Sequence, residues 1–222
     1  LFRSQVWLAA YGYKPIVVTF APFATRRVCD QIAVSVAYAK QNVKIVGTDP
    51  GITAELNGGT HMSFEDIATL RSIPSMTIYD AVDDTQVYQA IKQIMNTDGP
   101  CYIRMPRKAA QPVYDENYKF ALNKADVITK GNDITIVASG IMVAESLKAV
   151  LKLKEEGISA ELISANTIKP LDEETILNSI KKTNHVVTCE NHNVIGGLYS
   201  AVSEMLIEKY PLHVDKIAVM DQ

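Results

Sequence analysis

The sequence predicts an α/β protein of two domains, each built on a doubly wound, mostly parallel sheet. Its 222 residues suffice for one large domain or two small ones. Short apolar segments alternate with segments of helical spacing in each half, and residues 106–131 interrupt the alternation. Such alternation is typical of parallel sheets covered by helices on both faces. We expect a first domain over residues 1–107, a linker over 108–131 and a second domain over 132–222.

The first half contains four short apolar segments that are rich in β-branched or aromatic residues, as buried strands are. They are residues 15–20, 43–47, 76–79 and 101–104. Helical spacing predicts helices over residues 26–39 and 85–95. The segment Ser63-Phe-Glu-Asp66 resembles a capping box, so a third helix is expected to begin there and to run to about Ser72.

The second half repeats the pattern after a segment that contains Pro106, Pro112 and Gly131. That segment is expected to pair locally at most and to add no layer to either domain. Strands are expected at residues 133–138, 159–163, 186–189 and 216–220. Helices are expected between them at residues 142–156, 172–182 and 198–209.

Composition and charge exclude several classes of protein. Hydrophobic residues make up 47% of the chain and charged residues 21%, as in ordinary globular proteins. No apolar run approaches the roughly 18 residues needed to cross a bilayer. A net charge of −3 argues against nucleic acid as a partner, and three widely spaced cysteines form no disulfide or metal-binding pattern. We expect a cytoplasmic protein that binds neither membranes nor nucleic acid.

The arginines are unevenly distributed along the chain. All of them lie in the first half, at positions 3, 26, 27, 71, 104 and 107. The planar guanidinium forms forked hydrogen bonds with carboxylates and phosphates. A site for an anionic small molecule is therefore expected in the first half.

Three groups of residues follow expected strands, at the sheet edge where open α/β sheets bind ligands. Phe20 and Phe23 place two aromatic rings there, although two core phenylalanines would have the same spacing. Residues 47–61 form a loop with four glycines that ends at His61, before an expected helix. Arg107 follows another expected strand. A surface histidine and a solvated arginine are the alternatives for the last two residues.

Residues 190–197, with the sequence Glu-Asn-His-Asn-Val-Ile-Gly-Gly, also precede an expected helix. They match neither the dinucleotide-binding glycine pattern nor the P-loop. A tight turn is therefore favoured over a phosphate site at this position.

Many of these segments, in this order, resemble the transketolase family, and most closely the C-terminal subunit of the split bacterial transketolases. The resemblance runs from about Lys14 to the end of the chain. It is carried by the segments Val-Thr-Phe20-Ala-Pro-Phe23-Ala-Thr-Arg-Arg27, Val-Lys-Ile-Val-Gly47-Thr-Asp-Pro-Gly51, Asn57-Gly-Gly-Thr-His61, Gly99-Pro-Cys-Tyr-Ile-Arg104, Lys169-Pro-Leu-Asp172 and Glu190-Asn-His-Asn-Val-Ile-Gly-Gly197.

The resemblance implies an enzyme that uses thiamine diphosphate to transfer a two-carbon ketol unit between phosphorylated sugars, as in the pentose phosphate pathway. It implies that the first domain binds the pyrimidine half of the cofactor and that the second is the transketolase C-terminal domain. In the family a separate domain holds the diphosphate and Mg²⁺ through a Gly-Asp-Gly…Asn motif, which this sequence lacks. An N-terminal transketolase subunit with that domain is therefore implied as the partner, in a heterotetramer with two copies of each subunit.

The resemblance also implies roles for single residues. Phe23 matches the aromatic residue that stacks on the aminopyrimidine ring, and Phe20 matches a second apolar wall of that pocket. Stacking in a dry slot would control the protonation of the pyrimidine. His61 matches a histidine that faces the substrate carbonyl and hydroxyls, where it can polarise bonds or transfer protons. Arg107 matches the arginine that binds the sugar phosphate.

The sequence departs from many transketolases at three substrate-binding positions. Asp49 and Asn57 stand where many members have a histidine near the phosphate and an aspartate on a sugar hydroxyl, and Arg26 replaces a pocket tyrosine. An aspartate near the substrate phosphate is expected to repel it. The split branch of the family commonly shows these same changes.

The resemblance further implies truncation at both ends. Alignment of residues 8–9 places the essential glutamate of the family, which activates the aminopyrimidine, three residues before Leu1. The chain by itself is therefore expected to lack the activating acid and to be inactive.

Two other interpretations of the sequence stay open. One is a related thiamine enzyme, either deoxyxylulose-phosphate synthase or the beta subunit of a 2-oxo-acid dehydrogenase. The other is a non-catalytic scaffold subunit that keeps the fold and the dimer surface. A glutamate upstream of Leu1 in the full gene would favour an enzyme over the scaffold.

Overall fold

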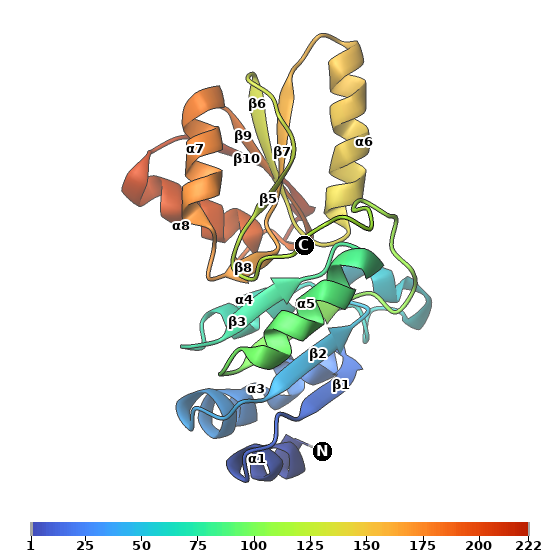
Figure 1. Cartoon of the computed structure of the whole chain (residues 1–222), viewed down its shortest axis with the longest axis vertical. Helices are drawn as coiled ribbons and strands as arrows, with labels where there is room; N and C mark the ends of the chain where they lie inside the picture. Colours follow the sequence, from blue (N-terminus) through green and yellow to red (C-terminus); the bar gives the residue numbers. More distant parts are fainter. Residues whose placement is uncertain (1, 222) are drawn as a thin grey trace.

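The computed structural model describes residues 2–221 and contains two five-stranded sheets with flanking helices (Figure 1). Their strand orders are β1-β2-β4-β3-β8 and β10-β9-β6-β7-β5. All strand pairs are parallel except β3 with β8 and β5 with β7. The predicted class, two mostly parallel α/β sheets, is confirmed.

The first part of the chain contains the strands β1 (Ile16–Phe20), β2 (Lys44–Thr48), β3 (Thr77–Asp80) and β4 (Cys101–Met105). Its helices are α1 (Phe2–Ala10), α2 (Ala21–Ala24), α3 (Cys29–Gln31), α4 (Asp66–Arg71) and α5 (Asp84–Asn96). Three further turns of helix are η1 (Arg26–Val28), the π-helix η2 (Ile32–Tyr38) and η3 (Gly51–Asn57). The helix expected over residues 26–39 is thus divided into a 3₁₀, an α and a π piece.

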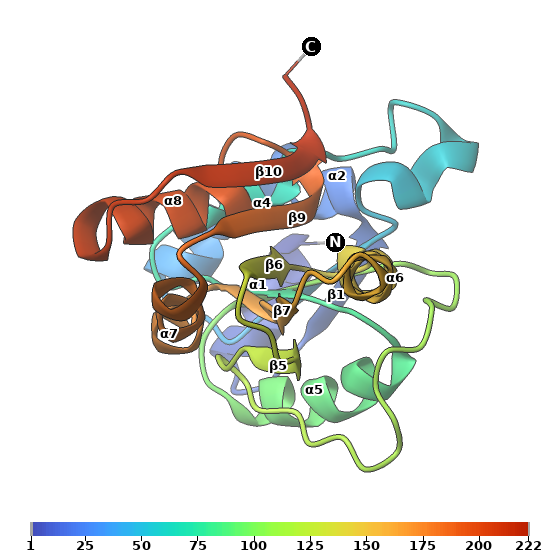
Figure 2. The same ribbon diagram turned by 90° about the horizontal axis from the view of Figure 1, so that it is seen from above.

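The second part contains β5 (Asp126–Thr129), β6 (Ile134–Ala138), α6 (Met142–Glu155), β7 (Ala160–Ser164), β8 (Thr167–Lys169), α7 (Glu173–Thr183), β9 (Val186–Asn193), α8 (Leu198–Lys209) and β10 (Val214–Val219). Figure 2 looks along this sheet and shows α6 on one side of it and α7 on the other. Asp83 and Asp172 begin α5 and α7, because each carboxylate accepts a backbone N–H in the first turn of its helix.

Three local expectations were wrong. The expected linker, residues 108–131, was predicted to pair locally at most, but its residues 126–129 form β5 and extend the second sheet by pairing with β7. Residues 190–193 were expected to turn, but they continue β9 as far as Asn193, which pairs with Val219 of β10 after a register shift. The capping box is absent: α4 begins at Asp66, whose carboxylate faces inward, and the Ser63 hydroxyl makes no hydrogen bond to any described residue.

The two sheets share one continuous core. β8 lies in the second half of the sequence but pairs with β3 as the edge strand of the first sheet. One apolar cluster joins Ile45 and Ile78 of the first sheet to Val137 of the second. The relative position of the two sheets is therefore set by buried contacts, which matters because residues of β9 reach the candidate site.

Candidate functional site

The candidate site lies at the carboxyl ends of three neighbouring strands. The register pairs Phe20 of β1 with Thr48 of β2, and Thr48 with Met105 of β4. The segments that follow these three residues therefore leave the sheet side by side. Open parallel sheets bind ligands at such an edge.

Three aromatic rings meet at this edge. The ring centroids of Phe20 and Phe23 are 6.1 Å apart, and that of His61 lies 4.9 Å from Phe20 and 5.1 Å from Phe23, all in edge-to-face geometry. All three side chains are partly exposed, so they are not the core phenylalanines of the alternative interpretation. They form an apolar wall that an aromatic ligand can contact.

Two guanidinium groups flank this wall. Arg27 lies 4.0 Å from the ring centroid of Phe23, and Arg107 lies 4.6 Å from that of Phe20. Both distances are within the range of cation–π interactions. Arg27 was not expected in the site, because the resemblance assigns a role to Arg26 and none to its neighbour.

Asp49 and Arg107 form an ion pair at the same edge. The buried Asp49 carboxylate accepts the backbone N–H of Arg107 at 2.8 Å and also the side-chain Nε–H. Arg107 Nη2 donates to Asn57 Oδ1 at 3.3 Å. Asp49 therefore orients Arg107 and offsets part of its charge. The sequence had indicated only that Asp49 would repel a substrate phosphate, and it did not predict this ion pair.

Arg26 lies beside the His61 loop. Its guanidinium pairs with Glu65 at 2.9 Å and donates to the Thr60 carbonyl at 3.4 Å. The Thr60 hydroxyl is 2.9 Å from Nδ1 of His61. The structure therefore brings all the predicted site residues into one connected cluster.

A buried charge network lies behind the site, and the local sequence patterns did not reveal it. Arg104 Nε donates to Asp66 at 2.8 Å, and Nη1 lies 3.3 Å from an Asp80 oxygen. Burial alone would lower the pKa of Arg104, but the two carboxylates raise it above its usual value. A charged residue inside the apolar strand 101–105 was the available signal, because a buried charge requires a partner.

Glu190 and His192 of β9 are also buried near this network. The Glu190 carboxylate accepts the backbone N–H groups of Leu198 and Tyr199 at the start of α8, at 2.7 and 2.9 Å. Burial lowers the pKa of His192, whose Nδ1 lies 2.7 Å from the Asn193 carbonyl. Its other ring nitrogen is 3.3 Å from the backbone N–H of Ala68. A neutral ring that donates from Nδ1 satisfies both contacts.

We expect Glu190 to make the stability of the protein depend on pH. Burial raises the pKa of its carboxyl from 4.5 to about 7, so the folded chain holds the proton more tightly than the unfolded chain. Its contribution to the free energy of unfolding is therefore full below about pH 4.5. It falls by on the order of 3 kcal/mol as the pH rises to about 7.

Urea denaturation at a series of pH values measures this effect. The free energy of unfolding of the wild type minus that of Glu190→Gln should decrease between pH 4.5 and 7 and become constant above that range. Parallel curves for the two proteins would contradict the assignment.

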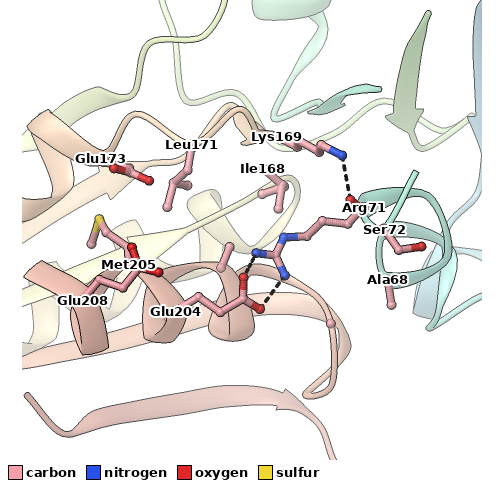
Figure 3. Close-up of a pocket in the computed structure, with 12 residues that line it drawn as sticks. Ala68, Arg71, Ser72, Ile168, Lys169, Leu171, Glu173, Glu204, Met205 and Glu208 are labelled. Carbon is pink, nitrogen blue, oxygen red and sulfur yellow. Dashed lines mark hydrogen bonds and ion pairs between the residues drawn. The ribbon is translucent and has the colours of Figure 1, made fainter. Parts of the chain in front are cut away.

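A cleft of about 570 Å³ lies between α4, β8 and α8 and contains none of the predicted site residues (Figure 3). Arg71 crosses it and pairs with Glu204 through both terminal nitrogens. Lys169 donates to the carbonyls of Arg71 and Ile73 at 2.8 and 2.6 Å. These contacts span the cleft and link the first part of the chain to β8 and α8, so Arg71 and Lys169 already have partners within the chain.

Within residues 2–221, no three side chains of His, Cys, Asp or Glu are grouped so that they could hold a metal ion. The same part of the chain contains no helix that is long and apolar enough to span a membrane.

Comparison with known proteins places the chain in a family. The transketolase pyrimidine-binding domain matches residues 6–112, and the transketolase C-terminal domain matches residues 123–222. A 6-deoxy-6-sulfo-D-fructose transketolase subunit of Clostridium sp. (strain MSTE9) is 53% identical over 96% of this chain and 66% of its own length. One of the subunits of the apulose-4-phosphate transketolase of Phocaeicola vulgatus is 37% identical over 97% of this chain and 69% of its own length.

A solved split-gene transketolase, described as an inactive beta4 tetramer, has a TM-score of 0.92 and 38% identity over 99% of this chain and 71% of its own chain. The two curated relatives and this structure therefore extend beyond the segment that this chain spans. The chain belongs to the transketolase family, whose pyrimidine-binding domains serve thiamine-diphosphate-dependent transferases.

The aromatic wall fits the pyrimidine half of this cofactor. Phe20, Phe23 and His61 present partly exposed rings at one sheet edge, and a heteroaromatic ring can stack on such a surface. The described residues have no metal-binding group for the Mg²⁺ that accompanies the diphosphate.

Proposed function

We propose that this chain is part of a subunit of a split transketolase, which transfers a two-carbon ketol unit between anionic sugars with thiamine diphosphate. The observation that carries the proposal is the convergence of the aromatic wall with the Asp49–Arg107 pair at one sheet edge. The wall suits the pyrimidine ring, and the neighbouring guanidinium suits the anionic end of a sugar. A partner subunit that carries the diphosphate-binding domain binds the diphosphate and Mg²⁺.

In this proposal each side chain has a separate role. The bound cofactor supplies the nucleophilic carbon and the electron sink for ketol transfer. Phe23 and Phe20 hold the pyrimidine ring and exclude water from it. His61 donates a hydrogen bond to a substrate oxygen or transfers a proton there, with its ring oriented by Thr60. Arg107 binds the anionic tail, held in place by Asp49.

Reconstitution tests the proposal. The full-length chain should be mixed with its partner subunit, thiamine diphosphate and Mg²⁺, and supplied with xylulose 5-phosphate and ribose 5-phosphate. Formation of the transfer products supports the proposal, whereas a well-folded complex that transforms no ketol donor rejects it and favours the scaffold. The inactive one-subunit assembly of the similar split-gene enzyme supports a need for the partner.

A sulfonated donor is a second candidate, favoured by the charge balance of the site. Arg26 and Arg107 each pair with a carboxylate, and Arg27 forms no ion pair with any described residue. The edge therefore has a local charge close to +1, which matches a monoanionic sulfonate better than a phosphate with a charge of roughly −1.5 to −2. The similar subunit that acts on 6-deoxy-6-sulfo-D-fructose supports this candidate. Measurement of kcat/KM for 6-deoxy-6-sulfo-D-fructose and for fructose 6-phosphate decides whether the site prefers a sulfonate or a phosphate.

We expect Phe23→Ala to weaken the binding of thiamine diphosphate to the reconstituted complex by about 1 to 3 kcal/mol, the scale of lost aromatic packing. Calorimetric titration of the cofactor in the presence of Mg²⁺ measures this directly. Phe23→Tyr keeps the ring and serves as the matched control. If Phe23→Ala binds the cofactor as tightly as the wild type, the role assigned to Phe23 is wrong.

A further inference from the structure

Asn191 of β9 reaches from the second sheet to the loop that carries Asp49. Its side chain is buried, with 6% of the residue exposed. Oδ1 accepts the backbone N–H of Ile52 at 3.1 Å, and Nδ2 donates to the Pro50 carbonyl at 3.1 Å. Both ends of this carboxamide therefore bind the backbone of one short segment, residues 50–52.

The loop at residues 49–52 has a backbone that needs external support. Asp49 has φ of 49° and Gly51 has φ of 56°, both in the left-handed region. A non-glycine residue there is uncommon and costs conformational energy. The carboxamide also lies against Gly51, because a Cβ built on that glycine would stand 2.4 Å from Asn191 Oδ1. Gly51 is thus required both by its φ angle and by the space that Asn191 occupies.

Asn191 is itself held by the buried charge network. Its backbone carbonyl accepts a hydrogen bond from Arg104 Nη2 at 2.6 Å. Arg104 is fixed in turn by Asp66 and Asp80. A continuous series of contacts therefore leads from the network through Asn191 and residues 50–52 to Asp49, which orients Arg107.

We propose that Asn191 is a positioning residue for the substrate-binding edge. It holds residues 49–52 in the conformation that presents Asp49 to Arg107, so the second sheet controls how the site binds the anionic tail of a sugar. Both polar atoms of its side chain bind this loop, so Asn191 acts on the tail through Asp49 and Arg107. The part of this inference that concerns substrate rests on the proposed function, whereas the part that concerns the loop does not.

Hydrogen exchange of the full-length chain, followed by mass spectrometry, tests the loop without any assay of activity. Asn191→Ala should increase exchange at residues 49–57 about tenfold, because the Ile52 amide loses its acceptor and the loop loses its support. Exchange in β4 should stay unchanged. Asn193→Ala is the matched control, because Asn193 lies on the same strand and its side chain binds Ile195 and Asp221 instead. Unchanged exchange at residues 49–57 overturns the proposal.

Asn191→Asp keeps the fold testable if the alanine variant unfolds. This replacement has nearly the same volume and keeps an acceptor for the Ile52 amide, but it places an oxygen against the Pro50 carbonyl. If Asn191→Ala is folded, the exchange rate at residues 49–57 of Asn191→Asp should lie between the rates of the wild type and of Asn191→Ala. If Asn191→Ala is unfolded, the exchange rate at these residues of Asn191→Asp should exceed that of the wild type. Wild-type exchange in a folded Asn191→Asp protein would also overturn the proposal.

Kinetics of the reconstituted enzyme test the consequence for substrate. Asn191→Ala should raise KM for an anionic ketol donor about tenfold and leave kcat/KM for the neutral ketol sugar L-erythrulose within about twofold. An equal loss for both donors would show a general structural role and overturn the positioning role. If the wild-type complex transforms neither donor, the proposed function fails, while the exchange experiment still decides the role of Asn191 in the loop.

Discussion

Replacing Arg104 with methionine is expected to lower the free energy of unfolding by about 3 to 5 kcal/mol. Arg104 is 1% exposed and is the counter-charge of two buried carboxylates, Asp66 and Asp80. Burial alone would raise the pKa of Asp66, and Arg104 holds it below its usual value. Without the guanidinium both carboxylates would be buried and uncompensated, so the folded state would have to take up protons or admit water.

Urea denaturation at neutral pH measures this loss. Arg26→Met is the matched control: it breaks an exposed ion pair with Glu65, and such pairs contribute about 0 to 1 kcal/mol. The combined replacement of Arg104 by Met and of both aspartates by Asn should recover part of the stability, since no buried charge remains. A loss below about 1 kcal/mol for Arg104→Met would show that the network does not stabilise the fold.

Replacing Arg107 with glutamine is expected to raise KM for an anionic ketol donor about 10- to 100-fold in the reconstituted enzyme. A hydrogen bond to a charged group contributes about 1.5 to 3 kcal/mol, which corresponds to this range. The neutral donor L-erythrulose has no tail for Arg107 to bind, so its kcat/KM should change by no more than about twofold. Steady-state kinetics with both donors measure the difference.

Two controls separate binding of the tail from damage to the loop. Lys108→Gln removes a neighbouring exposed charge and should leave both donors almost unaffected. The double variant Asp49→Asn, Arg107→Gln removes the carboxylate that would otherwise remain buried without its partner. Recovery of the wild-type KM in the double variant would mean that Arg107 neutralises Asp49 and does not bind the donor.

Apart from β5 and β8, the strands of both sheets could be predicted from the sequence because their local patterns are strong. Segments such as residues 43–47 and 101–104 are short, apolar and bounded by turn residues, and they form β2 and β4. The edge of the first sheet followed from these strands, since parallel strands place their carboxyl ends together. The resemblance to transketolases then selected Phe23, His61 and Arg107 at that edge, and the structure brings them together.

Local patterns failed where the neighbours come from distant parts of the chain. β8 is only three residues long, and it is a strand because β3 offers it an edge. Residues 190–193 contain charged and polar side chains typical of a turn, yet they continue β9. The Ser63 capping box did not form, because Asp66 is turned inward to accept hydrogen bonds from Arg104 and from the Tyr102 hydroxyl.

Residue order and polarity alone thus specify two α/β units and the sheet edge that carries the site. The tertiary structure decides which charges are buried together and which residue holds the loop. Arg104 is separated from Asp80, Asp66 and Asn191 by 24, 38 and 87 positions in the chain. A buried charge is stable only where an oppositely charged group is packed beside it. Which groups become neighbours depends on how the two sheets pack against each other, and no local pattern of residues contains that information.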